Sequence, residues 1–295
     1  MKPAPFTYHA PKTVDEALAH LATYGYEASV LAGGQSLVPT MNFRLAQPSV
    51  LVDINRIVDL AYLRPADDGG LRLGAMTRQR AVERSALVAE RAPLLHETMP
   101  NIAHPPIRNR GTIGGSIAHA DPAAELPAVM LALDAQFRLR SQQSERWVAA
   151  RDFFVGMFYT AKEPEELLVE IALPPMLPRS GWAFREVARR HGDYALAGVA
   201  AQVKVDERGP CRQARITLLS VGEGPVEAHE AARLLVGQDP TPEAIRAAAE
   251  AAATRDIDPA GDIHASAAYR RHLARVLTAD VLTKAFARAK DSLRS

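Results

Sequence analysis

Two short glycine-rich loops constrain this chain more than any other feature of its sequence. The first covers residues 30–37 (VLAGGQSL) and the second residues 110–117 (RGTIGGSI), and each joins two adjacent glycines to a hydroxyl residue. Adjacent glycines let the backbone come within hydrogen-bonding distance of a large anion, because no Cβ stands in the way. Successive N–H groups then form a concave nest for phosphate. Two such loops on one chain predict a dinucleotide whose diphosphate is held from two sides.

Neither loop matches a standard phosphate-binding fingerprint. The sequence AGGQS lacks the spacing of G-x-G-x-x-G, and no Gly-Lys-Ser/Thr follows it as in a Walker loop. A single Gly-Gly-x-Ser segment is more often a tight turn. The binding interpretation therefore depends on the presence of two such loops.

The charge balance and the cysteine count exclude several classes of protein. The chain has 295 residues, with 35 Lys and Arg against 34 Asp and Glu. This balance gives no electrostatic reason to bind nucleic acid or an anionic membrane. The single cysteine, Cys211, cannot form an intrachain disulfide or hold an iron–sulfur cluster. No run approaches the ~18 apolar residues of a spanning helix, and the first residues lack the apolar core of a secretory signal. We therefore expect a cytoplasmic protein without a transmembrane segment.

Hydrophobic patterning predicts a β–loop–α–β unit in residues 1–55. Thr13 and Glu16 have the spacing of a capping box at the start of an amphipathic helix. The expected elements are a helix over 13–24, a strand over 28–31, a helix over 37–45 and a strand over 49–54. We interpret this unit as an N-terminal lobe that carries the first glycine-rich loop.

Residues 56–175 mix short strands with helices, and we interpret them as a second lobe. Strands are expected over 71–75, 137–140 and 167–173. Asp121 is a natural N-cap and Pro122 suits a first helical position. This pattern predicts a helix that begins there and continues through the apolar run 126–133.

The proline-rich segment 174–178 breaks regular structure and predicts the boundary of a C-terminal domain over 176–295. Strands are expected over 195–205 and 214–221, followed by helices over 242–255 and 265–290. Apolar residues recur at helical spacing in the last helix: Tyr269, Leu273, Val276, Leu277 and Phe286. These patterns predict a small antiparallel sheet backed by helices, and an α+β fold class for the whole chain.

Two carboxylates follow the second loop, and each has a structural and a functional interpretation. Asp121 and Glu125 could cap a helix and complement its dipole, or accept hydrogen bonds from ribose or ribityl hydroxyls. Both roles can hold at once. Tyr194 lies in the charged segment 185–196. That segment is either a hairpin before a buried strand, or a site where an aromatic face packs on a flat ring and basic residues pair with an anion.

The sequence contains no arrangement typical of metal or nucleophilic catalysis. The segments HETMP (96–100) and HEAAR (229–233) lack the second histidine of a zincin helix, and neither Ser36 nor Ser116 has the glycines of a G-x-S-x-G elbow. We therefore expect no catalytic side chain and no metal site.

At these residues the chain resembles the FAD-binding medium subunit of the xanthine dehydrogenase/aerobic carbon monoxide dehydrogenase family of molybdenum hydroxylases. Residues 32–36 and 112–116 look like the two pyrophosphate loops of that family. Further similar motifs, in chain order, are 107–110, 120–125, RHGDY at 190–194 (the family's R-x-G-D-[FY] element) and YRRHL at 269–273 (its Y-R-x-x-L helix). The match covers essentially the whole chain.

The resemblance implies a fold, a cofactor and partners. The implied fold is a two-lobed PCMH/vanillyl-alcohol-oxidase-type FAD-binding domain followed by a C-terminal flavoprotein domain. The implied partners are a large molybdopterin-binding subunit and a small [2Fe–2S] subunit, usually in a dimer of heterotrimers. The residues expected to bind FAD are Leu31, Ala32, Gly33, Gly34, Gln35, Ser36, Leu37, Gly111, Thr112, Ile113, Gly114, Gly115, Ser116, Ala120, Asp121, Glu125, Arg185 and Tyr194.

Departures from the family pattern are mild. Ser116 stands where many relatives have Asn, and Glu125 stands where Asp is frequent. Both keep a side chain that forms hydrogen bonds. With Cys211 alone, the chain cannot hold the additional [4Fe–4S] cluster that some relatives carry.

The function implied by the resemblance is electron transfer from the [2Fe–2S] clusters through FAD to an external acceptor. Two other classes stay open. One is a self-sufficient FAD-dependent oxidoreductase of the same fold that acts on small molecules, and the other is a non-catalytic assembly or binding protein that retains the loops. The sequence determines neither the substrate of the complex nor the terminal acceptor.

Overall fold

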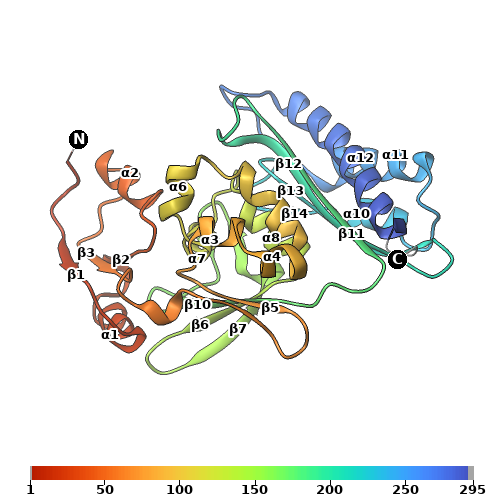
Figure 1. The fold of residues 1–295 in the computed structure, drawn as a ribbon. Helices are drawn as coiled ribbons and strands as arrows, with labels where there is room; N and C mark the ends of the chain where they lie inside the picture. Colours follow the sequence, from red (N-terminus) through yellow and green to blue (C-terminus); the bar gives the residue numbers. More distant parts are fainter. Residues whose placement is uncertain (1, 292–295) are drawn as a thin grey trace.

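The N-terminal lobe is a small parallel sheet flanked by helices, coloured red and orange in Figure 1. The computed structural model describes residues 2–291. The elements of this lobe are β1 (Thr7–His9), α1 (Val14–Tyr24), a 3-10 turn (Gly25–Glu27), β2 (Ala28–Leu31), α2 (Leu37–Asn42) and β3 (Val50–Asp53). Strand β3 lies between β1 and β2 and is parallel to both. The first glycine-rich loop therefore leaves the carboxyl end of β2 beside the end of β3.

The middle lobe is an antiparallel sheet covered by short helices. Its strands are β4 (Leu63–Pro65), β5 (Leu71–Gly74), β6 (Gln136–Arg140), β7 (Glu145–Ala149) and β10 (Leu167–Leu173), in the order β4-β5-β10-β6-β7. Its helices are α3 (Gln79–Glu83), α4 (Ala86–Arg91), α5 (Pro93–Thr98), α6 (Pro105–Arg110), α7 (Ile113–His119), α8 (Glu125–Ala132) and α9 (Ala150–Phe153). A small hairpin of β8 (Phe154–Gly156) and β9 (Tyr159–Thr160) precedes β10. The second glycine-rich segment runs from the end of α6 into the first turns of α7, so Gly114 and Gly115 are helical and Thr112 is the N-cap.

The C-terminal lobe is an antiparallel sheet with helices on its outer face, seen in green and blue in Figure 1. Its strands β11 (Ser180–Ala188), β12 (Ala195–Val205), β13 (Cys211–Leu219) and β14 (Val226–Glu227) pair in chain order. Its helices are α10 (His229–Leu235), α11 (Pro242–Ala251) and α12 (Ala267–Asp291), with a π-helical turn (Ala252–Asp256) after α11. Strands over 195–205 and 214–221 and helices near 242–255 and 265–290 were expected, and the structure confirms them with small differences at their ends.

Buried apolar side chains join the three lobes. Leu167 of β10 packs in one cluster with Leu18 and Val52 of the N-terminal lobe. Phe184 and Ala200 of the C-terminal sheet belong to the core of the middle lobe. Because burial of apolar surface fixes these contacts, it also fixes the space between the lobes.

The expected cap at Thr13 is confirmed, since its side chain accepts a hydrogen bond from the Glu16 amide at 3.2 Å. The helix expected over 37–45 ends at Asn42, and Arg44 adopts a left-handed conformation with φ 57°. A residue in that conformation ends the helical hydrogen-bond pattern.

The helix start predicted at Asp121 is wrong. Ala120 closes α7 in a left-handed conformation, and the Asp121 side chain accepts the Ala123 amide at 2.9 Å in a turn. Helix α8 begins at Glu125, with Ala124 as its N-cap. Asp121 caps a turn instead of a helix, because a turn over residues 121–124 separates the end of α7 from the start of α8.

The apolar face predicted for the last helix is only partly correct. Leu273, Leu277 and Phe286 are buried in α12, whereas Tyr269 and Val276 are half exposed. The helix packs on the sheet through small residues instead, with Ala274, Ala285 and Ala289 fully buried. Close packing through alanines moves the buried stripe away from the larger residues.

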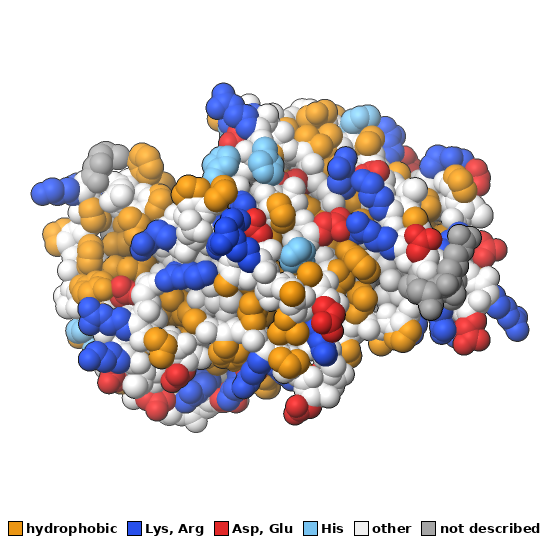
Figure 2. All heavy atoms as spheres, viewed as in Figure 1, with side chains coloured by type: hydrophobic (Ala, Val, Ile, Leu, Met, Phe, Trp, Pro, Cys, Tyr) orange, Lys and Arg blue, Asp and Glu red, His pale blue; other side chains and the backbone are white. Residues whose placement is uncertain are grey.

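The surface carries no single dominant charge on the face drawn in Figure 2. Lys and Arg are interspersed there with Asp and Glu and with separate hydrophobic groups. None of the helices in the described range 2–291 is long and apolar enough to cross a membrane.

The contact between β11 and α12 gives a stability prediction. A Cβ added at Gly181 would lie 1.8 Å from the Ala285 carbonyl oxygen. We expect Gly181→Ala to lower the free energy of unfolding by about 3 kcal/mol, measured by thermal unfolding. In the matched variant Gly156→Ala the new Cβ would meet nothing within 4 Å, so its melting temperature should stay close to that of the wild type. Equal melting temperatures for the two variants would contradict this packing.

Candidate functional site

A cleft with a volume of about 670 Å³ lies where the three lobes meet. Both glycine-rich loops line it, and so do the segment 192–194 of the C-terminal lobe and the segment 158–168 of the middle lobe. These four segments are far apart in the chain. The cleft therefore exists only because the lobes pack together.

The two glycine-rich loops converge, as the sequence predicted. A Cβ added at Gly33 would lie 2.5 Å from the Arg110 carbonyl oxygen and 2.8 Å from the Cα of Gly111. No side chain fits between backbones at this separation. Gly33 is therefore required for the loops to touch, while Gly34 supplies a positive φ of 72° at the turn.

The first loop presents free backbone donors. Within the described part of the chain, the amides of Gly34, Gln35 and Ser36 form no hydrogen bond, and the side chain of Gln35 donates back to the Gly33 carbonyl at 3.0 Å. Successive unpaired amides in a turn form an anion-binding concavity. This loop can hold a phosphate without further rearrangement.

The second loop uses its amides differently. The Ile113 and Gly114 amides donate to the carbonyls of Thr77 and Ala75 at 3.0 and 2.9 Å, and the Gly115 amide donates to the Thr112 hydroxyl at 3.1 Å. These bonds tie the loop to the residues after β5. This segment therefore has few free amides: the Thr112 hydroxyl caps the start of α7, and Thr112 and Ser116 both line the cleft.

Asp121 and Glu125 place two carboxyl groups in the wall of the cleft. Glu125 is only 7% exposed. Burial, reinforced by the nearby Asp121, raises the pKa of Glu125 to about 7. Glu186 of β11 lies behind it, and burial together with Glu125 raises the pKa of Glu186 to about 8. Near neutral pH the Glu125 carboxyl can thus donate a hydrogen bond as well as accept one.

Tyr194 stands at the mouth of the cleft. The residue is 66% exposed, and desolvation of its hydroxyl, together with the charges of Asp121 and Glu125, raises the pKa of Tyr194. The turn before it is tight, because Gly192 has a φ of 88° and an added Cβ would lie 2.4 Å from the Cε1 of His104. The R-x-G-D-[FY] element thus brings an aromatic ring from the C-terminal lobe to the cleft.

The structure does not bring Arg185 to the cleft. Its side chain lies on the face of β11 that α12 covers and pairs with Asp280 at 3.2 Å. Alternation along the strand explains this, since the neighbouring Glu186 points to the opposite face. We expected Arg185 at the FAD site because the sequence alone does not show which face of the sheet a strand residue points to.

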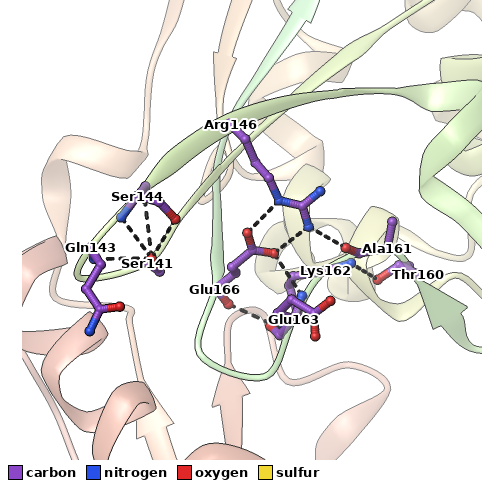
Figure 3. A network of polar contacts seen from close by, with 9 residues as sticks. All are labelled: Ser141, Gln143, Ser144, Arg146, Thr160, Ala161, Lys162, Glu163 and Glu166. Atoms are coloured by element: carbon purple, nitrogen blue, oxygen red, sulfur yellow. Dashed lines mark hydrogen bonds and ion pairs between the residues drawn. The ribbon is translucent and has the colours of Figure 1, made fainter.

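Residues of the segment 160–166 also line the cleft, and a network of polar contacts holds this segment in place (Figure 3). Arg146 of β7 binds Glu166 through two hydrogen bonds, of 2.7 and 2.8 Å, and also donates to the Ala161 carbonyl at 2.6 Å. The Glu166 carboxylate accepts the Glu163 amide at 2.8 Å as well. Lys162 lines the cleft, and burial lowers its pKa. Sequence reasoning missed this loop, because a run of charged residues around a proline is typical of a solvated turn.

The predicted and observed linings overlap in part. The expected residues that line the cleft are Ala32, Gly33, Gly34, Gln35, Ser36, Leu37, Gly111, Thr112, Gly114, Gly115, Ser116, Asp121, Glu125 and Tyr194. Four expected residues lie outside the lining: Leu31, Ile113, Ala120 and Arg185. Gln79 is a lining residue that was not expected, and its buried Oε1 has no hydrogen-bond partner. This oxygen is therefore available to accept a hydrogen bond.

Comparison with known proteins identifies the family. Residues 4–176 match the family described as "FAD binding domain in molybdopterin dehydrogenase", and residues 182–285 match "CO dehydrogenase flavoprotein C-terminal domain". The chain belongs to the FAD-binding medium subunits of the molybdenum hydroxylases. FAD is the cofactor of this family's first domain, and the chain is an oxidoreductase subunit.

Individual relatives cover nearly the whole chain. It is 45% identical over 295 residues to the 6-hydroxypseudooxynicotine dehydrogenase complex subunit alpha of Paenarthrobacter nicotinovorans, covering 100% of this chain and 99% of that protein. It is 38% identical to the caffeine dehydrogenase subunit beta of Pseudomonas sp. (strain CBB1), covering 99% and 97%. The solved carbon monoxide dehydrogenase of Hydrogenophaga pseudoflava superposes with a TM-score of 0.94 at 41% identity, covering 98% and 99%. This medium-subunit fold confirms the expected α+β class.

The residues of the cleft fit FAD. The first loop leaves backbone donors unpaired, and Gly33 keeps a cradle open that a Cβ would fill. The carboxyl and hydroxyl groups of Asp121, Glu125 and Ser116 match a chain of sugar and ribityl hydroxyls in chemistry.

Burial of Glu125 predicts a pH-dependent stability of the FAD-free chain. The pKa of Glu125 is higher in the folded chain, at about 7, than in the unfolded chain, so the folded chain binds the extra proton between these values. The free energy of unfolding therefore falls as the pH rises from the unfolded pKa to about 7 and levels off above it. We expect Glu125→Gln to gain about 2 kcal/mol over the wild type at pH 8 and nothing at pH 5.

Denaturant unfolding at the two pH values measures this difference. Glu223→Gln, at an exposed position, serves as the control and should follow the wild type at both. If the free energy of unfolding of Glu125→Gln differed from that of the wild type by the same amount at both pH values, burial would not raise the pKa of Glu125.

Proposed function

We propose that this chain is the FAD-carrying electron-transfer subunit of a molybdenum hydroxylase. It takes electrons from the [2Fe–2S] clusters of a small partner subunit and passes them to an external acceptor, while a large molybdopterin-binding subunit oxidises the substrate. The complex is proposed to be a dimer of heterotrimers. When bound, FAD supplies the exchange between one-electron and two-electron carriers, and the protein supplies position and electrostatics.

One observation carries this proposal: where the two glycine-rich segments meet, the cleft has a cradle of unpaired backbone amides that suits an anion. The unpaired amides of the first loop face the space beside the second loop. Among the described residues, neither the Ser36 nor the Ser116 hydroxyl is hydrogen-bonded to a base. The ring of His119, which also lines the cleft, packs against Phe158 at 5.1 Å between centroids. A backbone cradle of this kind suits the diphosphate of a dinucleotide cofactor.

The names of the relatives support a division of labour. Proteins 38–45% identical to this chain carry names as different as caffeine dehydrogenase and 6-hydroxypseudooxynicotine dehydrogenase, and a carbon monoxide dehydrogenase medium chain is 40% identical. Substrates so unlike one another share no common recognition chemistry. We infer that another subunit selects the substrate and that this chain serves electron transfer.

The proposed roles follow the geometry of the cleft. The amides of residues 34–36 and the hydroxyls of Thr112 and Ser116 hold the diphosphate. Asp121 and Glu125 bind sugar or ribityl hydroxyls. Tyr194, at the exposed mouth, covers the isoalloxazine ring and limits access by the final acceptor.

The cradle role of Gly33 is directly testable. An alanine there would force the first loop away from the Arg110 carbonyl, 2.5 Å from the new Cβ. We expect Gly33→Ala to weaken FAD binding at least about 100-fold, measured as flavin absorbance retained by the purified protein. The control Gly224→Ala has open space around its Cβ and should retain normal flavin. An unchanged flavin content in Gly33→Ala, with circular dichroism like that of the wild type, would refute the cradle.

Electron transfer is tested in the assembled complex. We expect substrate to bleach the flavin absorbance anaerobically when the large and small subunits are both present, and not when the small subunit is left out. The isolated chain loaded with FAD should turn over no small molecule in a screen of the relatives' substrate classes. Turnover by the isolated chain would instead support a self-sufficient oxidoreductase.

A further inference from the structure

Asn55 and Arg78 connect the two glycine-rich loops from outside the cleft. Arg78 lies between β5 and α3, and Asn55 follows β3. The Arg78 guanidinium donates from Nη2 to the Asn55 Oδ1 at 2.7 Å, and from Nη1 to the Arg110 carbonyl oxygen. The Asn55 Nδ2 donates to the Ala32 carbonyl oxygen at 2.8 Å. A continuous chain of hydrogen bonds thus runs from one loop to the other, and we name these two residues the Asn55–Arg78 clip.

The orientation of the Asn55 side chain is fixed by its neighbours. Its Nδ2 and its backbone amide both donate to the Asp53 Oδ1, at 2.5 and 2.9 Å, and the Tyr8 hydroxyl donates to the Asp53 Oδ2 at 2.6 Å. Burial alone would raise the pKa of Asp53, but the hydrogen bonds from Tyr8 and Asn55 lower it below its usual range. An ionised Asp53 holds the amide nitrogen on its own side, so the amide oxygen faces Arg78.

The backbone of Arg78 belongs to the middle lobe, and its side chain contacts Asn55 of the N-terminal lobe. Its backbone forms an isolated antiparallel bridge with Thr112, and the next amide, from Gln79, donates to the Gly111 carbonyl at 2.9 Å. Burial, together with the nearby charge of Arg110, lowers the pKa of Arg78. The positive charges of Arg78 and Arg110 thus lie close to each other and near both loops, which favours a bound anion.

We propose that the Asn55–Arg78 clip is a positioning device that keeps the two loops at the separation the FAD diphosphate requires. Neither residue is among those that line the cleft, so the clip acts through the backbone carbonyls of Ala32 and Arg110. The contact of Gly33 with Arg110 sets how closely the loops approach. The clip limits how far the two loops can separate. It therefore holds the unpaired amides of the first loop in place before FAD binds. This inference rests on the proposed function.

The test compares Arg78→Ala and Asn55→Asp in the assembled complex. Asn55→Asp keeps an acceptor for Arg78 but removes the donor to the Ala32 carbonyl and places a second carboxylate beside Asp53. We expect each variant to raise the dissociation constant of FAD about tenfold to a hundredfold, because a charge-assisted or buried hydrogen bond is lost. In the Asn55→Asp/Arg78→Ala double variant the loss should be no larger than in the more damaging single variant, since both substitutions break one chain of bonds.

Phosphorus NMR of bound FAD separates positioning from general loosening. The two phosphorus resonances should shift in both single variants, while the visible absorption band of the flavin ring stays in place. Arg91→Ala is the control. Arg91 donates a hydrogen bond of 2.8 Å to the Gly69 carbonyl and is not among the residues that line the cleft, so this variant should match the wild type.

Three results would count against the clip. FAD affinity within twofold of the wild type, with unmoved phosphorus resonances, would overturn it. A shift of the visible band together with the phosphorus resonances would also overturn it, in favour of a loosened fold. A wild-type complex that holds no FAD would overturn the proposed function and the clip together, whereas a flavin-loaded wild type with unaffected variants would overturn the clip alone.

Discussion

The contact between the backbone at Gly33 and the backbone at Arg110 and Gly111 is the constraint on which the site depends. It brings a loop from a parallel sheet against a loop between two helices, at a distance where a single Cβ would lie 2.5 Å from a carbonyl oxygen. In the first loop the amides of residues 34–36 form no hydrogen bond, and residues of both loops line the same cleft. An anion recovers these hydrogen bonds, so the binding surface is backbone and needs little from particular side chains.

Shared cores hold this contact in place. The C-terminal sheet completes the core of the middle lobe, and β10 completes that of the N-terminal lobe. None of the three lobes can therefore move far without exposing apolar surface. The same packing buries Glu125 and Glu186, whose raised pKa values, about 7 and about 8, record the low polarity beside the cleft. The fold thus determines both the shape of the site and the protonation of its wall.

The local features were predictable because they depend on neighbours in the chain. The Thr13 cap, the long apolar strand β12 and the two Gly-Gly segments all follow from short-range rules. Features that depend on long-range packing were not. Asp121 does not cap a helix, because α7 ends at His119 and α8 begins only at Glu125. Arg185 lies outside the cleft because its position along β11 turns it toward α12. The loop held by Arg146 and Glu166 carries no local signal at all.

The sequence alone determined the chemistry that the chain can offer: flexible glycine backbones, two neighbouring carboxylates, an aromatic ring after Gly-Asp, and no metal-binding or nucleophilic set. These properties belong to residue types and short spacings, and they sufficed to recognise the family. Only the tertiary structure decided which of these groups meet. Whether Gly33 touches Arg110, or whether Asn55 reaches Arg78, depends on contacts between segments tens of residues apart, and these form only when buried apolar surface brings the lobes together.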